Sequence, residues 1–132
     1  MLKTIKVSDY MAATLVTFKP DMGMKVAISH LLEKRISGAP VVDDHGNLVG
    51  MLSEQDCMKM ALTAGYHEDM GGLVRDYMTP NVDTVEAETS ILKLAQKFID
   101  QPNRRRFPVL HNNRLVGQVS RRDVLRAIEK IG

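Results

Sequence analysis

Apolar residues recur along residues 24–32 with the spacing of a helix. They stand at i, i+3, i+4, i+7 and i+8: Met24, Ala27, Ile28, Leu31 and Leu32. This spacing places them on one stripe of an α-helix, which must pack against other apolar groups. A second set follows later in the chain with the same spacing: Ile91, Leu94, Ala95, Phe98 and Ile99. The pattern predicts two amphipathic helices.

Short β-prone stretches surround each predicted helix. Around the first helix, one stretch precedes it at 15–18 and two follow it at 39–42 and 48–52. Around the second helix, the corresponding stretches are at 82–85, 107–110 and 115–119. The two that follow are separated by Asp, Asn, Gly or His residues that favour a tight turn. A closing helix is predicted next, with its apolar positions at Cys57, Met58, Ala61 and Ala64 or at Val124, Leu125, Ile128 and Ile131. Each unit is therefore β-α-β-β-α, an α/β (α+β) arrangement.

The two units are copies of one sequence pattern. Residues 7–11 recur as 74–78, and residues 50–56 recur as 117–123, both at an offset of 67. A repeat that keeps its register over this length indicates a duplicated structural unit. We expect repeat 1 at 1–66, a linker at 67–73 and repeat 2 at 74–132. The two repeats should share a core, because each alone is near the lower size limit for a stable one.

Composition is that of an ordinary soluble protein. The chain is 44% hydrophobic and 26% charged, and it has no apolar run long enough to cross a bilayer. The first residues lack the apolar stretch of a signal peptide, so we expect a cytoplasmic protein with no membrane partner. Cys57 is the only cysteine, which excludes an intrachain disulfide and a cysteine-cluster zinc site. Its helical position favours core packing over reactivity.

Basic residues are unevenly distributed, although the net charge is only +2. Arg35 is the one arginine of repeat 1, and the others are Arg75, Arg104, Arg105, Arg106, Arg114, Arg121, Arg122 and Arg126. If an anion binds, it should lie nearer the basic residues of repeat 2.

The most specific motif is Gly-x-apolar-Ser-x-x-Asp, which occurs at 50–56 and 117–123 where a strand meets a helix. One interpretation is a capping box that satisfies the free backbone donors of the helix start. The other is a ligand site, in which the helix N-terminus faces a phosphate while the Asp accepts hydrogen bonds from ribose hydroxyls. Capping boxes favour the longer Glu at the third position, so the Asp in both copies shifts the balance toward a ligand.

The duplicated unit resembles a tandem pair of cystathionine β-synthase (CBS) domains, also called a Bateman module. Besides the two motifs, Asp76-Tyr77-Met78-Thr79-Pro80 and Ser37-Gly38-Ala39-Pro40-Val41-Val42-Asp43 fit the family pattern. The resemblance covers nearly the whole chain. It implies that the repeats pack with pseudo-twofold symmetry and form two clefts between them, each able to hold an adenosine-containing ligand.

Site residues follow from this resemblance. One cleft would use Thr14, Gly38, Ala39 and Pro40 around the base, with Ser120 and Asp123 on phosphate and ribose. Its mate would use Asn81, Arg106 and Phe107 with Ser53 and Asp56. Arg121 and Arg122 follow Ser120, whereas Glu54 and Gln55 follow Ser53, so we expect unequal sites with the Asp123 cleft better for a charged nucleotide.

The predicted function is that of a non-catalytic regulatory module that senses AMP, ADP, ATP or S-adenosylmethionine and needs no other cofactor. A homodimer and a regulated enzyme or transporter are the expected partners. One alternative is a structural dimerisation module with empty clefts. Another is weak nucleic-acid binding through the repeat 2 arginines, which an aromatic content of 5% without tryptophan disfavours. The histidines lack metal-ligand spacing, and no catalytic nucleophile and base can be paired, so neither a metal nor an enzyme is predicted.

Overall fold

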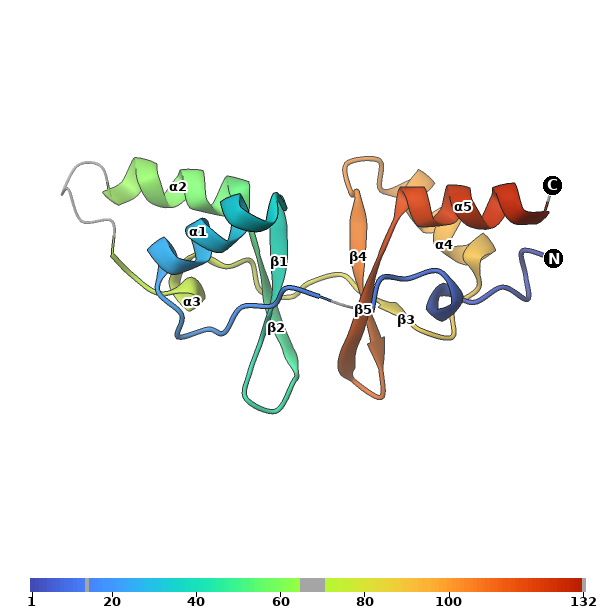
Figure 1. Ribbon diagram of the computed structural model, residues 1–132, viewed down its shortest axis with the longest axis horizontal. Helices are drawn as coiled ribbons and strands as arrows, with labels where there is room; N and C mark the ends of the chain where they lie inside the picture. Colours follow the sequence, from blue (N-terminus) through green and yellow to red (C-terminus); the bar gives the residue numbers. More distant parts are fainter. Residues whose placement is uncertain (14, 65–70, 132) are drawn as a thin grey trace. The chain divides into compact units, whose positions relative to one another are not determined.

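The computed structural model describes residues 1–13, 15–64 and 71–131, which form two compact units (Figure 1). The Asp56 unit comprises Val16–Val82, and the Asp123 unit comprises Met1–Leu15 together with Asp83–Gly132. Neither unit coincides with a sequence repeat. The opening segment of repeat 1 belongs to the unit that holds the rest of repeat 2, and residues 74–82, which open repeat 2, belong to the unit that holds most of repeat 1.

The Asp56 unit packs three helices against a two-stranded sheet. Its elements are α1 (Met24–Lys34), β1 (Gly38–Val42), β2 (Leu48–Ser53), α2 (Glu54–Ala64) and α3 (Val74–Tyr77). Strands β1 and β2 pair antiparallel, as the turn at 43–47 predicts. The strand predicted at 15–18 is reduced to a single parallel bridge between Phe18 and Val41. Phe18 is nevertheless buried in the core with Met24, Leu52 and Met60.

The Asp123 unit has the same plan with one more strand. Its elements are η1 (Val7–Asp9), β3 (Val85–Glu86), α4 (Ile91–Asp100), β4 (Arg106–His111), β5 (Arg114–Ser120) and α5 (Arg121–Ile131). The sheet order is β3-β4-β5, with β3 parallel to β4 and β4 antiparallel to β5. In the core the rings of Phe98 and Phe107 lie 4.9 Å apart between centroids. The predicted mixed fold of two β-α-β-β-α copies is confirmed, except that the first strand of one copy is a bridge.

The first amphipathic helix of each copy buries most of the predicted stripe, although Leu32 and Ile99 at its end are 74% and 71% exposed. The closing helices bury fewer of the predicted positions. In α1, Met24, Ala27 and Leu31 are buried. In α2, Met58 was predicted to face the core and is 64% exposed, while Asp56 and Met60 are buried instead. The prediction was wrong because α2 begins at the Ser-x-x-Asp motif. That motif turns its carboxylate inward and sets the rotation of the helix.

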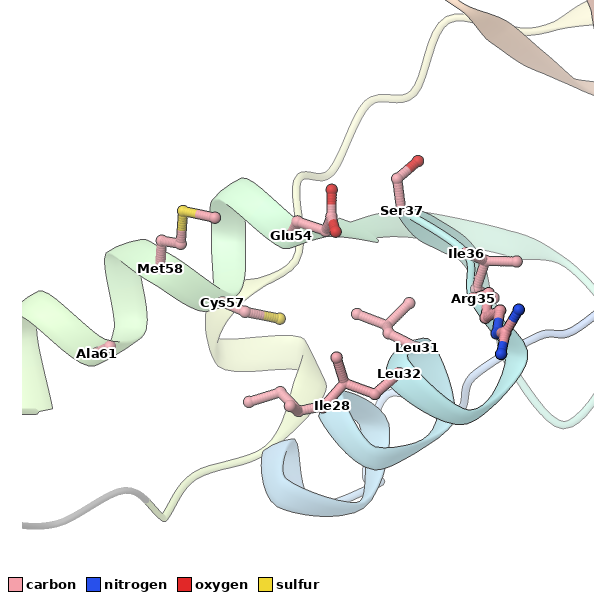
Figure 2. A pocket seen from close by; sticks show the side chains of 10 residues that line it. All are labelled: Ile28, Leu31, Leu32, Arg35, Ile36, Ser37, Glu54, Cys57, Met58 and Ala61. Carbon is pink, nitrogen blue, oxygen red and sulfur yellow. The ribbon is translucent and has the colours of Figure 1, made fainter.

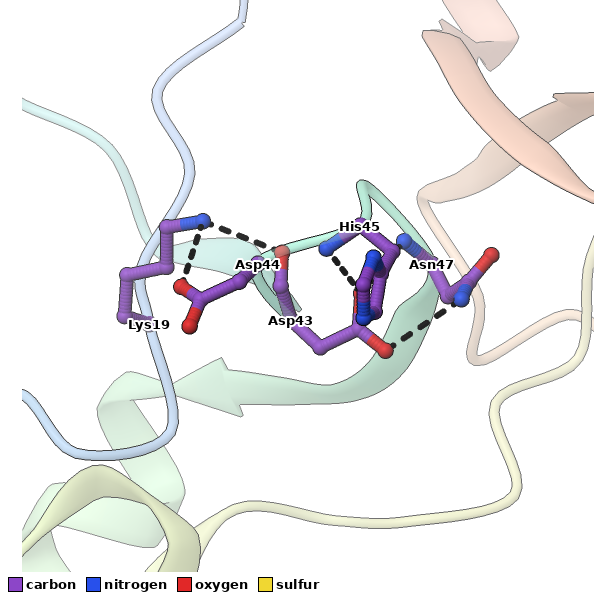
Figure 3. A network of polar contacts seen from close by, with 5 residues as sticks. All are labelled: Lys19, Asp43, Asp44, His45 and Asn47. Atoms are coloured by element: carbon purple, nitrogen blue, oxygen red, sulfur yellow. Dashed lines mark hydrogen bonds and ion pairs between the residues drawn. The ribbon is translucent and has the colours of Figure 1, made fainter.

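Side chains as well as backbone hold the β1–β2 turn together (Figure 3). Oδ1 of Asp43 accepts hydrogen bonds from the backbone N–H groups of His45 and Asn47, each at 2.9 Å, and Nζ of Lys19 donates to the Asp43 carbonyl at 3.0 Å. The Asn47 N–H, followed by that of His45, lowers the pKa of Asp43. In the β4–β5 hairpin, Asn112 and Asn113 both have positive φ (51° and 64°), the conformation that a two-residue hairpin turn needs.

Candidate functional site

The motif glycines mark the places where an opening segment runs against a strand. In the Asp123 unit, a Cβ at Gly117 would lie 2.7 Å from both the Ala12 carbonyl oxygen and Sδ of Met11. Ala12 and Gln118 exchange backbone hydrogen bonds of 2.8 and 2.9 Å next to this position. Glycine is therefore required because the incoming backbone leaves no room for a side chain.

The same arrangement recurs in the Asp56 unit. A Cβ at Gly50 would lie 2.6 Å from Sδ of Met78 and 3.0 Å from the Thr79 carbonyl oxygen. Met51 and Thr79 exchange backbone hydrogen bonds of 2.9 and 2.8 Å. In each unit, a segment from one sequence repeat is thus bonded to the strand that leads into the Ser-x-x-Asp motif of the other repeat.

Both Ser-x-x-Asp motifs form capping boxes. Oδ2 of Asp123 accepts from the Ser120 N–H at 2.8 Å and the Ser120 hydroxyl at 3.1 Å, and the Asp123 N–H donates back to Oγ of Ser120 at 3.3 Å. The Asp56 box has the corresponding distances of 2.9, 3.0 and 3.2 Å to Ser53. Asp therefore closes the box in both copies, although capping boxes favour the longer Glu at this position. Each box engages one carboxylate oxygen, so Oδ1 can serve a second partner.

The second carboxylate oxygen has a different partner in each unit. Oδ1 of Asp56 accepts from the Thr79 hydroxyl at 3.2 Å. Oδ1 of Asp123 pairs with Nη1 of Arg126 at 2.9 Å. At the offset of 67, the position of Thr79 is occupied by Ala12 in the Asp123 unit, so this position supplies no hydroxyl to Asp123.

A pocket of about 210 Å³ lies beside Asp123. It is lined by Ala12, Arg106, Gln118, Val119, Ser120 and Asp123. Strands β4 and β5 pair Arg106 with Ser120, and the alternation of side chains along a strand puts Gln118 on the same face as Ser120. Phe107, Val109 and Val119 alternate with these residues and are fully buried. One face of the hairpin therefore builds the core, and the other presents polar groups to the pocket.

Arg106 is the free cation of this pocket. Its side chain is partly buried, and within the described part of the chain its guanidinium has no hydrogen-bond or ion-pair partner. A partly desolvated guanidinium beside a serine hydroxyl and a helix N-terminus is suited to hold an anion. The prediction groups Arg106 with Ser53 and Asp56. In the structure, the β4–β5 register places Arg106 opposite Ser120, and both line the pocket beside Asp123.

The other predicted site residues are placed as follows. Phe107 and Ala39 are 0% exposed, and their side chains belong to the two cores. Pro40 is buried too, whereas Gly38 is partly buried and pairs with Ser53.

Two other predicted site residues lie on the surface. Asn81 is exposed with a φ of 56°, and Arg122 is exposed on α5. Thr14 lies outside the described residues.

Other arginines of repeat 2 make contacts within the protein. The guanidinium of Arg104 lies 4.7 Å from the centroid of the Phe107 ring and donates to the Arg106 carbonyl at 3.3 Å. Arg121 donates to the Pro102 carbonyl and lies 6.0 Å from the Phe98 ring. The arginine run is thus partly structural, which leaves Arg106 as the basic side chain directed to the pocket.

Sequence reasoning missed Ala12, Gln118, Thr79 and Arg126 as neighbours of the motif. The repeat offset carries a signal for two of them, because residues 12 and 79 occupy equivalent positions immediately after the matched segments 7–11 and 74–78. Arg126 stands three residues after Asp123 in α5, a spacing at which helix side chains meet.

An apolar groove of about 620 Å³ lies between α1 and α2 of the Asp56 unit (Figure 2). Its walls are formed by Ile28, Leu31, Leu32, Cys57, Met58 and Ala61, and Arg35, Ser37 and Glu54 stand at one end. Burial, with smaller effects from Asp56 and Glu54, raises the pKa of the Cys57 thiol. This keeps the thiol protonated and unreactive, in line with the packing role expected for it.

The described residues contain neither a metal-binding cluster nor a membrane-spanning helix. Within residues 1–13, 15–64 and 71–131, no three His, Cys, Asp or Glu side chains come together in a way that could hold a metal ion. None of the helices in those ranges is long and apolar enough to cross a membrane.

The model of the CBS domain family matches residues 7–62 and 74–130. The chain therefore belongs to the CBS domain family and carries two tandem copies of the domain. These matches coincide with the duplicated segments found at the offset of 67.

Solved structures with this fold include ligand complexes. The crystal structure of CBSX2 in complex with AMP superimposes with a TM-score of 0.83 at 31% identity, covering 96% of this chain and 98% of that one. The CBS domain pair of protein MJ0100 in complex with 5′-methylthioadenosine and S-adenosyl-L-methionine superimposes with a TM-score of 0.76 at 26% identity, covering 96% and 98%. The class of protein is thus a CBS pair whose structural relatives bind adenosyl compounds.

Curated relatives are longer proteins. The A-adding tRNA nucleotidyltransferase of Aquifex aeolicus is 31% identical over 130 residues, covering 96% of this chain and 15% of that protein. CBSX1 of Arabidopsis thaliana, a chloroplastic CBS domain-containing protein, is 30% identical over 139 residues, covering 86% and 58%. The chain thus spans well under two thirds of the length of both relatives.

Proposed function

We propose that this chain is a regulatory module that binds an adenine nucleotide or related adenosyl compound, and that the Asp123 pocket is its principal site. The observation that carries the proposal is the free guanidinium of Arg106 beside Ser120 and Asp123 at the start of α5. The complexes of CBSX2 with AMP and of MJ0100 with S-adenosyl-L-methionine support the ligand class.

Each residue has a distinct role in this proposal. Arg106 holds a phosphate beside the start of α5 through its unpaired guanidinium. Asp123 accepts hydrogen bonds from the ribose hydroxyls at Oδ1, while its Oδ2 stays in the capping box. Because Ala12 lines the same pocket, the site joins residues from both sequence repeats.

The size of the pocket fits this division of roles. Pockets that enclose whole small-molecule ligands are typically about 300–1,000 Å³. A pocket of about 210 Å³ is large enough for a ribose and one phosphate, so the base extends beyond the residues that line it.

The site at Asp56 is weaker for a charged ligand. Gly38 stands where Arg106 stands in the other unit, so no guanidinium faces Ser53 from β1. The Thr79 hydroxyl also occupies Oδ1 of Asp56. An entering ribose must displace this hydrogen bond without gaining a phosphate contact in return.

We also propose that the module forms a homodimer and acts on a regulated enzyme or transporter. The dimer is supported by apolar side chains left in solvent on the helices: Leu32 is 74% exposed, Leu62 75% and Ile99 71%. Exposed apolar side chains of this kind are typical of protein interfaces, and Leu32 also lines the apolar groove between α1 and α2. A purely structural dimer with empty sites is the second candidate, and it predicts no response to adenosyl compounds.

Isothermal titration of AMP and adenosine tests the proposal. Arg106→Met should weaken AMP binding about 10-fold or more, as expected for loss of a charge-assisted hydrogen bond, with little effect on adenosine. Arg105→Met is the matched control, since it removes the same charge from the adjacent, exposed position. Equal effects of the two substitutions on AMP, or no binding by the unmodified protein to AMP, ADP, ATP or S-adenosylmethionine, would contradict it.

A further inference from the structure

Arg126 occupies the carboxylate oxygen of Asp123 that the proposed ribose contact requires. Its Nη1 lies 2.9 Å from Oδ1 of Asp123. Since Oδ2 is held by Ser120, Oδ1 is the oxygen that remains for a ligand. The carboxylate is 10% exposed, so a ligand has few other directions from which to approach it.

The same guanidinium is bonded to the opening segment. Nη2 of Arg126 donates to the Tyr10 carbonyl at 3.2 Å, across 116 positions in the sequence. Tyr10 lies two residues before Ala12, which lines the pocket and is bonded to Gln118. Arg126 therefore links the ligand-binding carboxylate to the segment that forms another wall of the pocket.

Arg126 is also free to move away. Its side chain is 62% exposed, so the guanidinium can rotate into solvent when a ligand takes its place on Asp123. The Asp56 unit lacks this device: the position equivalent to Arg126 is Lys59, which is exposed, and Oδ1 is bonded to Thr79.

We propose that Arg126 sets the affinity of the Asp123 site by competing with the ribose for Oδ1, and that ligand entry releases both of its contacts. Binding thereby loosens the Tyr10 segment, which gives the module a structural response to occupancy. This inference rests on the proposed function, because it concerns the same site. A ligand shifts an equilibrium between two states only if it binds them with different affinity. The two states here are the one in which Arg126 contacts Asp123 and Tyr10, and the one in which both contacts are released.

Adenosine is the appropriate probe because it lacks the phosphate that loss of a positive charge would affect. Arg126→Met removes both contacts and keeps an unbranched apolar stem in the helix. The expected result is an adenosine Kd about three- to tenfold lower than in the unmodified chain, since one competing hydrogen bond is removed. Lys130→Met removes a charge from an exposed site on the same helix, and Lys59→Met does so at the equivalent position, so neither should change the Kd.

Hydrogen exchange gives a second readout. Backbone amides of residues 8–13 should exchange faster in Arg126→Met without ligand, and in the unmodified chain they should exchange faster once adenosine is bound. The single ammonium group of Arg126→Lys cannot bridge Asp123 and Tyr10 with the same geometry. In this variant the amides of residues 8–13 should exchange at a rate between those of the unmodified chain and Arg126→Met.

An unchanged or higher adenosine Kd in Arg126→Met would overturn the inference. If the unmodified chain still bound AMP through Arg106, the proposed function would survive that result. If neither protein bound adenosine or AMP, both proposals would fall together.

Discussion

The hydroxyl of Thr79 donates a hydrogen bond of 3.2 Å to Oδ1 of Asp56, although the two residues are 23 positions apart and belong to different sequence repeats. Asp56 is 7% exposed, and its Oδ2 is already bonded to Ser53. Thr79 therefore supplies a donor that the buried carboxylate cannot easily replace with water. The opening segment of repeat 2 is joined to repeat 1 through a side chain as well as through the backbone.

Replacing Thr79 with valine should destabilise the protein. The substitution keeps the shape but removes the donor, and we expect a loss of about 1 kcal/mol in the free energy of unfolding. Urea denaturation followed by circular dichroism measures it. Thr17→Val, at an exposed threonine of the same unit, is the control. An equal denaturation midpoint for both variants would show that the hydrogen bond to Asp56 contributes nothing.

Gly117→Ala should destabilise the Asp123 unit by about 1–3 kcal/mol. The added Cβ would lie 2.7 Å from the Ala12 carbonyl oxygen, and backbone cannot yield as a flexible side chain does. Gly23→Ala is the control, because a Cβ there meets no atom within 4 Å. Thermal unfolding should show a larger loss of Tm for Gly117→Ala than for Gly23→Ala, which only replaces Gly by the less favourable Ala at the N-cap of α1. A similar Tm for both would mean that the Ala12 segment shifts at no cost.

Asp83 should contribute to acid sensitivity. A hydrogen bond from Lys97 at 2.8 Å, with Gln101 as a further donor, lowers the pKa of Asp83 in the folded state. A carboxyl group whose folded pKa is lowered stabilises the protein above its unfolded value of about 3.9, and this contribution is lost as the pH falls through the folded value.

Asp83→Asn should therefore lose less stability on acidification than the unmodified chain. Urea midpoints measured from about pH 5 to about pH 2 would show this as a shallower slope. Asp21→Asn, at an exposed aspartate of the other unit, controls for the change in net charge. Identical slopes for Asp83→Asn and the unmodified chain would mean that the pKa of Asp83 is not lowered on folding.

Ligand-induced stabilisation should depend more on Asp123 than on Asp56. At a concentration about 100 times its Kd, a bound nucleotide adds about 2.7 kcal/mol, a Tm shift on the order of ten degrees for a protein of this size. Asp123→Ala should abolish most of the shift produced by AMP, and Asp56→Ala should reduce it less. Each variant is compared with its own ligand-free Tm, since both lose a capping box. Equal losses would contradict the inequality of the two sites.

Leu32→Glu should weaken the proposed homodimer without unfolding the chain. Leu32 lines the α1–α2 groove and is 74% exposed, so a carboxylate there costs little in the monomer and much in an apolar interface. Val26→Glu is the control, since Val26 is 51% exposed on the same helix and does not line the groove. Light scattering after size exclusion should give a lower molar mass for Leu32→Glu alone. A monomeric unmodified chain would exclude the dimer.

The sequence predicted the fold well because its signals are local. The i, i+3, i+4 spacing in residues 24–32 and the turn residues at 43–47 each act within a few positions, and the offset of 67 repeats them. The rotation of α2 was missed because apolar residues such as Met58 were assumed to face the core, whereas the buried Asp56 carboxylate sets that rotation.

The site was predicted less completely, because it depends on contacts between distant segments. Ser120 and Asp123 are a local motif and were found, but the pairing of Ala12 with Gln118 spans most of the chain. Arg106 is a candidate from the sequence, where it is grouped with Ser53. Its position opposite Ser120 follows from the register of β4 and β5, which the hairpin turn determines.

The opening segment of each repeat is bonded to the motif strand of the other repeat, and this has a consequence for a chain that contains only one repeat. A polypeptide with only one repeat would lack the strip of backbone that covers Gly50 or Gly117, and its Ser-x-x-Asp strand would keep open donors and acceptors along one edge. Such a fragment could satisfy them by trading segments with a second identical fragment. The doubled gene can thus be read as a domain-swapped pair of ancestral halves made permanent by fusion.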